Sequence, residues 1–280
     1  MASKLGGVGL LAASLALFSC SDKDPEPAPL LEDCIGENCK PIAGPGGNNN
    51  PGNGSGGSGG GSDLEDVTTT VLGTIHATTD SSFLVGTVYV GPSTVKAYGA
   101  DGAIIETDSM AGQFIIEDVA AGPNWFALEE QHVQRTLLPT LQPVFVDPDE
   151  PETVLVGVDE QIFLSTLDLM VPTQIPVSGT AHAILFFRRE SNEPIPGVSL
   201  KSWGSADAVA YDATPSYEVA DPPDEGATGA LGTVLLVNVP AVPYPGSLVD
   251  IQFQEEDGET KVVSIRIASN YVTRAAVIVE

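Results

Sequence analysis

The sequence predicts an all-β chain, and three observations carry that prediction. Glycine (30) and proline (22) make up 52 of the 280 residues, which favours short strands joined by turns. Continuous helical periodicity is hard to find, while short apolar runs separated by turn residues fill the chain from Val67 onward. With 42% apolar residues and this length, we expect one or two packed domains after residue 67.

The charge balance excludes two classes of partner. The chain has 11 basic and 38 acidic residues, and therefore a formal charge of 11 − 38 = −27. Such a surface repels phosphate backbones and anionic lipid, and the sequence has no basic stripe to overcome the repulsion. We therefore expect no nucleic-acid partner.

Residues 1–19 are typical of a secretion signal. Lys4 precedes an uncharged stretch that runs to Phe18 and is too short to span a membrane. The letters LFSC at 17–20 resemble the lipobox of bacterial lipoproteins, which implies cleavage before Cys20 and acylation of its thiol and of the new N-terminus. Several acyl chains give stable anchoring. An ordinary signal peptide with an incidental cysteine is the alternative.

The resemblance also bears on localisation. In such lipoproteins an Asp after the cysteine favours retention in the inner membrane, and this chain has Ser21 there. The sequence thus predicts an outer-membrane, lipid-anchored protein, with the periplasmic and cell-surface faces both open.

Residues 20–66 are predicted to be a flexible Gly/Asn/Ser-rich tether. The segment 44–62 contains ten glycines and no charged or large apolar residue, so it cannot bury enough surface to fold. Cys34 and Cys39 lie close together in this tether, and an exported protein meets an oxidising compartment, so we expect a disulfide between them. A zinc site would need more ligands, and no cofactor is implied.

The first folded region, 67–168, carries a series of strand signals. The hairpin signal Asp101-Gly102 separates two of its apolar runs. A further stretch, 124–138, is interpreted as a strand at its start and is left open at its end. The expected strands lie at 83–90, 94–98, 103–107, 112–119 and 153–158.

The second region, 169–280, follows the same pattern. Apolar and polar residues alternate over 249–254 and again over 263–267, on the two sides of Asp257-Gly258. This alternation predicts a hairpin with one buried face and one exposed face. The other expected strands lie at 177–187, 197–203, 232–239 and 273–280.

The two regions share a repeated motif. GQFIIEDVAA at 112–121 and GTVLLVNVPA at 232–241 are separated by 232 − 112 = 120 residues, which suggests a duplicated domain. The first copy, with Gly86, Thr107-Asp108 and Phe114, resembles the carboxypeptidase regulatory-like domain, a transthyretin-like (prealbumin-like) fold. The second copy resembles it more loosely. The resemblance implies two tandem transthyretin-like (Ig-like) β-sandwich domains after a disordered Gly-rich tether, and domains that space or present other modules without catalysis.

The candidate catalytic and metal-binding residues all have simpler structural interpretations. His76, His132 and His182 lie in expected strands or edges without a nucleophile motif, so we interpret them as ordinary histidines. Acidic residues cluster in three loops, at 147–152, 221–225 and 255–257. Because no EF-hand spacing is present, solvated charge is the preferred interpretation of these loops and no metal site is assigned. Calcium binding by these loops stays open as the alternative.

The remaining candidates are aromatic. Trp203, Tyr211 and Tyr217 lie near or inside the insertion 205–227 of the second copy and could bind a ligand from an exposed face. We expect this insertion to be a surface element whose removal leaves the domain folded.

These patterns predict a non-enzymatic, membrane-anchored lipoprotein. Its β-sandwich domains would act as a structural spacer and protein-interaction module at the cell envelope. The alternative is a glycan-binding or adhesive surface module that uses the 205–227 insertion, and a hydrolase ranks third.

Overall fold

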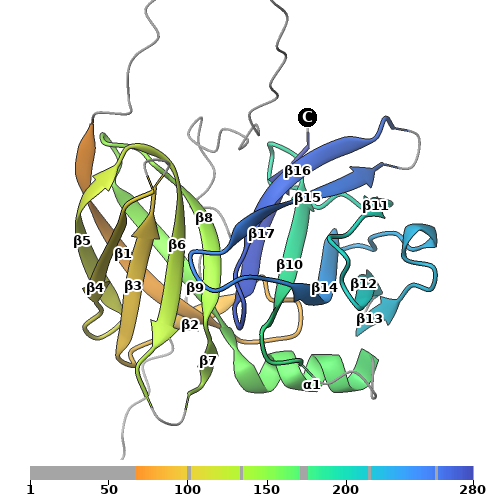
Figure 1. The fold of residues 1–280 in the computed structure, drawn as a ribbon, viewed down its shortest axis with the longest axis horizontal. Helices are drawn as coiled ribbons and strands as arrows, with labels where there is room; N and C mark the ends of the chain where they lie inside the picture. The colour runs from red at the N-terminus through yellow and green to blue at the C-terminus, as the bar shows by residue number, and fades with distance from the viewer. Residues whose placement is uncertain are drawn as a thin grey trace, which may run out of the picture.

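The computed structural model describes residues 67–99, 102–132, 135–170, 176–213, 216–255 and 258–279. Within them the fold is all-β apart from the helix α1 (Glu160–Met170) and the 3₁₀ turn η3 (Pro223–Glu225) (Figure 1). The signal segment, the tether and Cys20, Cys34 and Cys39 lie outside the described residues. The strands are β1 Thr68–Thr78, β2 Gly86–Val88, β3 Ser93–Tyr98, β4 Ile104–Asp108, β5 Gln113–Ala120, β6 Gly122–Glu130, β7 Leu137–Leu138, β8 Thr140–Val146, β9 Glu152–Asp159, β10 Thr180–Arg188, β11 Ser199–Ser202, β12 Ala208–Ala213, β13 Ser216–Val219, β14 Thr233–Pro240, β15 Ser247–Gln254, β16 Lys261–Ile267 and β17 Val272–Ile278.

The first half is a two-layer sandwich. One layer has the order β2-β1-β9-β7 with β5 also paired to β1, and the other is formed by β8-β6-β3-β4. Side chains from both layers form one buried cluster that includes Ile75, Phe114 and Phe126. A Cβ on Gly73 would lie 2.1 Å from the Phe114 ring, so this glycine lets the ring pack directly on the β1 backbone.

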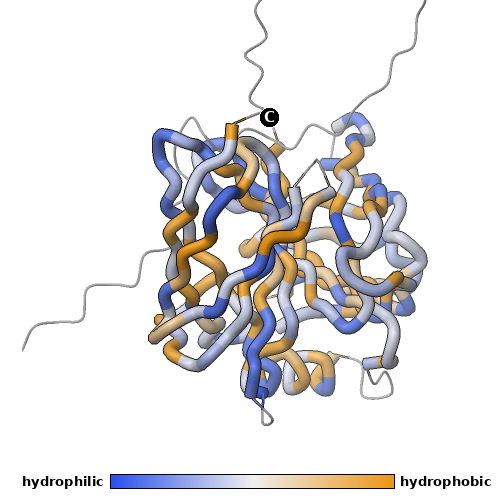
Figure 2. Tube along the Cα trace, turned by 60° about the vertical axis from the view of Figure 1, so that its left-hand side comes forward, coloured by the Kyte–Doolittle hydropathy of each residue, from blue (hydrophilic) through white to orange (hydrophobic). Residues whose placement is uncertain are grey.

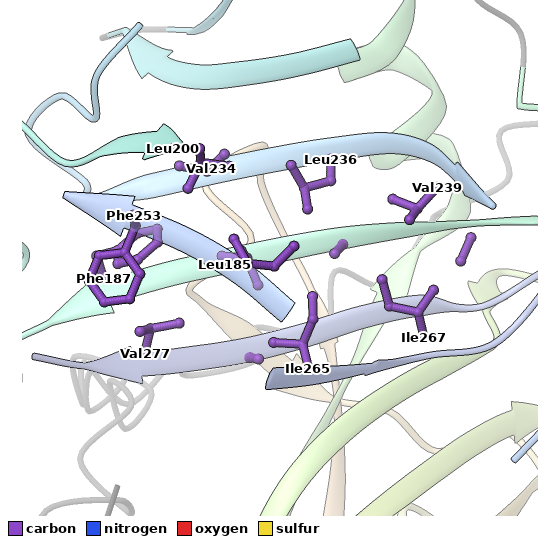
Figure 3. Close-up of a cluster of buried hydrophobic side chains, with 14 of the residues drawn as sticks. Leu185, Phe187, Leu200, Val234, Leu236, Val239, Phe253, Ile265, Ile267 and Val277 are labelled. Carbon is purple, nitrogen blue, oxygen red and sulfur yellow. The ribbon is translucent and has the colours of Figure 1, made fainter. Parts of the chain in front are cut away.

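The second half is also layered. The sheet β13-β12-β14-β10-β17 is covered on one face by the smaller sheet β11-β15-β16, and Figure 3 shows Leu185, Phe187 and Leu236 packed between them. A separate cluster with Phe163, Ile184 and Phe186 covers the opposite face, where α1 packs. Because both faces are covered, β10 and β14 are almost entirely buried, which explains their continuous apolar runs. In β3 and β5, by contrast, buried side chains alternate with more exposed ones, and Figure 2 shows hydrophobic and hydrophilic residues interspersed along the trace.

The two halves share one sheet. β8 of the first half pairs in parallel with β17 of the second, through Val272↔Thr140 and Thr273↔Leu141. The result is a nine-stranded sheet of order β13-β12-β14-β10-β17-β8-β6-β3-β4. The predicted all-β class with two tandem sandwiches is therefore confirmed, and backbone pairing joins the sandwiches to each other.

The internal repeat has a structural counterpart. β1 is antiparallel to β5 and parallel to β9, and β10 is antiparallel to β14 and parallel to β17. Both antiparallel pairs contain a register shift, one between Thr69 and Val71 and the other between Ala181 and Ala183. Asp118 and Asn238, which are 238 − 118 = 120 residues apart, both have positive φ, at 60° and 54°. A β-bulge explains both features.

Several elements were not expected from the sequence. The strands β1, β8, β12 and β13 and the helix α1 are new, and the expected strand at 83–90 is reduced to Gly86–Val88 with Phe83 buried in the preceding turn. The predicted domain boundary at 168/169 falls in the last turn of α1. No helix in the described part of the chain is long and apolar enough to span a membrane.

The expectation that 205–227 is a removable surface element is wrong. Residues 208–213 form β12, which pairs with β14 inside the large sheet, and β13 pairs with β12. The side chains from Ala208 to Asp212 are all buried. This segment is therefore an integral part of the second sandwich.

Candidate functional site

The three aromatic candidates do not share an exposed face. Tyr211 and Tyr217 are only 3% and 5% exposed, and they pack into the two different clusters that cover opposite faces of the sheet. The Tyr211 hydroxyl accepts a hydrogen bond from the Leu200 amide at 3.0 Å and donates one to the Pro223 carbonyl at 2.8 Å. Trp203 is half-buried against the same cluster as Tyr211. These three side chains pack in the interior of the second sandwich, where the Tyr211 hydroxyl also links two backbone segments by hydrogen bonds. They therefore do not form a shared aromatic surface on which a ligand could stack.

The described residues of the acidic loops lie in turns and make local hydrogen bonds and ion pairs. Asp147 accepts a hydrogen bond from the Asp149 amide at 2.9 Å within its own turn. Glu255 forms ion pairs with Arg189 and with Lys261. Among the described residues, no group of three or more His, Cys, Asp or Glu side chains is arranged to hold a metal ion.

The three histidines lie in different surroundings. His76 is half-buried on β1 and His132 is exposed, whereas His182 on β10 is 8% exposed and its ring lies 5.1 Å from that of Phe163. Burial lowers the pKa of His182 to about 4, because the uncharged imidazole loses less hydration than the charged one. Its Nδ1 accepts a hydrogen bond from the Asn238 amide at 3.3 Å.

His182 also lines a cavity of about 410 Å³ between α1, the start of β10 and the start of β17. Other polar groups on its wall include Arg135, Glu160 and Ser178. In a catalytic triad Nδ1 donates to a carboxylate, whereas here Nδ1 is the acceptor of a backbone hydrogen bond. The geometry therefore gives a neutral, weakly basic imidazole rather than an oriented general base.

This burial predicts a specific dependence of stability on pH. The folded-state pKa of His182 lies below the unfolded value of about 6.5, so the unfolded state binds more protons between these values and stability falls as pH falls. We expect the free energy of unfolding to fall by about 2 kcal/mol between pH 7 and pH 5 because of this residue. Denaturant titrations of wild type and His182→Gln at both pH values measure the difference.

The matched control for that experiment is His76→Gln, which makes the same substitution at a histidine outside the cavity and corrects for the effect of removing any one imidazole. Burial by itself would raise the pKa of Glu130, but hydrogen bonds from Tyr89 and from the Leu137 and Thr136 amides lower this pKa from 4.5. Glu130 is therefore ionised in both the folded and the unfolded state over most of this pH range. An equal pH slope in wild type and His182→Gln would contradict the assignment.

A cluster of charged and aromatic side chains joins the two halves; we call it the joint cluster. It combines side chains of β3 and β6 with side chains of β16, of the turn between β16 and β17 and of the turn before β15. Its members are Lys96, Tyr98, Glu129, Tyr244, Arg266 and Tyr271.

Contacts within each half and contacts across the joint connect the members of the joint cluster. Lys96 pairs with Glu129 at 2.6 Å, and Glu129 accepts a hydrogen bond from the Tyr271 hydroxyl. Lys96 Nζ also lies 5.5 Å from the centre of the Tyr244 ring, and the Tyr244 and Tyr271 rings stack at 5.6 Å. Cations above aromatic faces are attracted by the ring electrons.

The electrostatics of the cluster follow from this packing. Burial, together with the nearby Glu129 carboxylate, raises the pKa of Tyr244 to about 12. Burial and the hydrogen bond to Glu129 also raise the pKa of Tyr271. Both phenols therefore stay protonated at neutral pH, and Tyr271 remains a hydrogen-bond donor across the joint.

A second connection lies on the opposite face of the large sheet. Phe83, in the loop between β1 and β2, is fully buried, and its ring lies 6.0 Å from Phe163 and 6.3 Å from Tyr217. Its carbonyl accepts a hydrogen bond from Arg274 Nε at 3.2 Å. Together with the β8–β17 pairing, these contacts hold the two sandwiches at one orientation.

The chain is similar to some solved structures, all at low sequence identity. No family model and no curated protein matches the chain. Among solved structures, it is similar to the Bacillus anthracis TIE protein, at 9% identity and a TM-score of 0.23, covering 74% of this chain and 33% of that one. The chain thus spans about a third of that protein.

Two further solved structures are similar at the same level. A Streptococcal ancillary pilin has 10% identity and a TM-score of 0.22, with 75% of this chain and 68% of that chain covered. A proposed adhesin from Bacteroides ovatus has 7% identity and a TM-score of 0.23, with 81% and 99% covered.

Proposed function

We propose that the chain is a non-enzymatic lipoprotein of the outer membrane whose two sandwiches, 67–168 and 169–280, form a rigid spacer and protein-interaction module. The observation that carries this proposal is the connection between the sandwiches. A continuous sheet, the contacts of the joint cluster across the joint and the buried Phe83 loop would resist bending there. A module that holds a binding surface away from a membrane needs that stiffness.

The sequence before the folded part supports the same proposal. The run ending in LFSC would supply the lipid anchor at Cys20, and residues 20–66 would supply a long flexible connection, with Cys34 and Cys39 in a disulfide. A flexible tether followed by a rigid body lets the body sample many positions above the membrane while its surface keeps a fixed shape. The resemblance to carboxypeptidase regulatory-like domains fits this role, because such a domain presents other modules without catalysis.

The anchoring part is tested by replacing Cys20 with Ala. We expect the mature wild-type protein to begin at Cys20 and to carry acyl chains, detected as added mass on the N-terminal peptide. The Cys20→Ala protein should lack acylation and leave the membrane fraction. Cys34→Ala is the matched control, because it removes a cysteine outside the lipobox and should leave acylation intact. Membrane retention of unacylated Cys20→Ala would overturn the proposal.

A further inference from the structure

The outward face of the β5-β1-β9 sheet carries exposed apolar side chains where a solvated sheet face normally carries polar ones. In β1 the residues Val71 and Ile75 point into the core, so Leu72 points outward. Leu72 lies opposite Ile115 on β5, and residues directly opposite each other in a ladder share a face. Val88 on β2 lies opposite the outward-facing His76.

The neighbouring turn extends this surface. Met110 bridges to Gln113, which lies opposite Thr74 on the outward side of β1. The exposed fractions are 42% for Leu72, 56% for Ile115, 58% for Val88 and 82% for Met110. We call these four residues the outer apolar patch. Single exposed apolar residues are ordinary, but several on one sheet face indicate an interaction site.

The charges around the outer apolar patch define the partner. Residues 67–92, 109–122 and 147–159, which contain β1, β2, β5 and β9 with their adjoining turns, include no Lys or Arg. Exposed Glu117 follows Ile115 by two residues on the same strand face, and exposed Glu152 lies opposite Leu72 on β9. The patch is therefore an apolar centre with acidic edges.

We propose that the outer apolar patch docks a protein segment in which apolar side chains are flanked by Lys or Arg. Apolar side chains of the partner would cover Leu72 and Ile115, while its cations would meet Glu117 and Glu152. A second copy of this chain fits poorly, since it would bring two acidic faces together without a cation between them. The inference rests on the interaction role proposed above and names the surface and the partner chemistry for it.

The test uses two synthetic peptides of equal length and charge, one with alternating Lys and Val and one with alternating Lys and Ser. Because the chain carries a net charge of −27, any basic peptide gains general attraction, and the difference between the peptides isolates the apolar contribution. Fluorescence anisotropy with the full-length chain should show the Lys–Val peptide binding at least 10-fold more tightly than the Lys–Ser peptide.

The double variant Leu72→Thr/Ile115→Thr should abolish this difference, since threonine suits an outward strand position and removes the apolar contact. The matched control is Leu248→Thr/Val262→Thr, which removes two exposed apolar residues (53% and 57%) from the β15–β16 hairpin and should keep the difference. An unchanged difference in the first variant, or an equal loss in both, overturns the proposal.

Two other occupants are outcomes of the same series. Self-association of the chain in analytical ultracentrifugation that the Leu72→Thr/Ile115→Thr variant removes would overturn the proposal in favour of a second copy. Binding to phosphatidylcholine vesicles that depends on the patch, without a preference for the Lys–Val peptide, would overturn it in favour of lipid. Either result leaves acylation at Cys20 untouched, so failure of this inference is separable from failure of the anchoring proposal.

Discussion

Replacing Asp212 with Ala is expected to lower the free energy of unfolding by about 3–5 kcal/mol. The carboxylate is 2% exposed in β12 and accepts three backbone hydrogen bonds: from Gly229 at 3.0 Å, from Leu231 at 2.7 Å and from Thr233 at 2.7 Å. These bonds fix the turn that leads into β14. Removal of the carboxylate leaves three donors without their acceptor, and buried unsatisfied donors are costly.

The charge of Asp212 adds to this effect. Burial lowers the pKa of Arg188, and the Asp212 carboxylate raises it again by favouring the charged guanidinium. Arg188 is itself only 5% exposed, so losing Asp212 also leaves a buried cation with less compensation. A stability of about 5–15 kcal/mol is typical of folded proteins, which makes this substitution a severe one.

Two further variants sharpen the Asp212 experiment. Asp212→Asn keeps one acceptor oxygen and should cost clearly less than Asp212→Ala. Asp250→Ala is the matched control, because Asp250 is an exposed strand residue that accepts a hydrogen bond only from the Ser264 side chain among the hydrogen bonds described for it. Its loss should change the free energy of unfolding by about 0.5 kcal/mol or less. Chemical denaturation gives all three values, and a loss below about 1 kcal/mol for Asp212→Ala would contradict the assigned role.

Deleting residues 205–227 is expected to abolish cooperative unfolding of the second sandwich. The deletion removes β12 and β13, opens the β14 edge and takes Val209, Tyr211 and Tyr217 out of the two cores. Each large apolar side chain contributes about 1.5–3 kcal/mol by burial, so the loss is comparable to the whole stability of a domain. Thermal unfolding followed by near-UV and far-UV circular dichroism measures it.

A deletion of similar length serves as the control. Removing 44–62 from the Gly-rich tether should leave the melting transition unchanged, because the segment has no large apolar side chain to bury. A cooperative transition at the wild-type temperature after removal of 205–227 would show that β12 and β13 are dispensable, and would return the segment to the role of a surface insertion.

The sequence by itself determined the strand-rich class, most strand positions and the internal repeat. Period-2 alternation predicted the β15–β16 hairpin, and Asp101-Gly102 predicted the β3–β4 hairpin, because both signals depend on residues that are neighbours in the chain. The 120-residue repeat was readable from the similar strings at 112–121 and 232–241, and the structure shows positive φ at the equivalent residues Asp118 and Asn238.

Tertiary structure alone decided the rest. Tyr211 and Tyr217 are candidates for a binding face in the sequence, yet they are buried because β12 joins the edge of β14, a pairing between distant segments that no local pattern specifies. The β8–β17 pairing and the joint cluster likewise link residues more than 100 positions apart, as the bond between Glu129 and Tyr271 shows. The outer apolar patch follows the same rule, since Leu72, Val88, Met110 and Ile115 become one surface only when β1 brings their strands together.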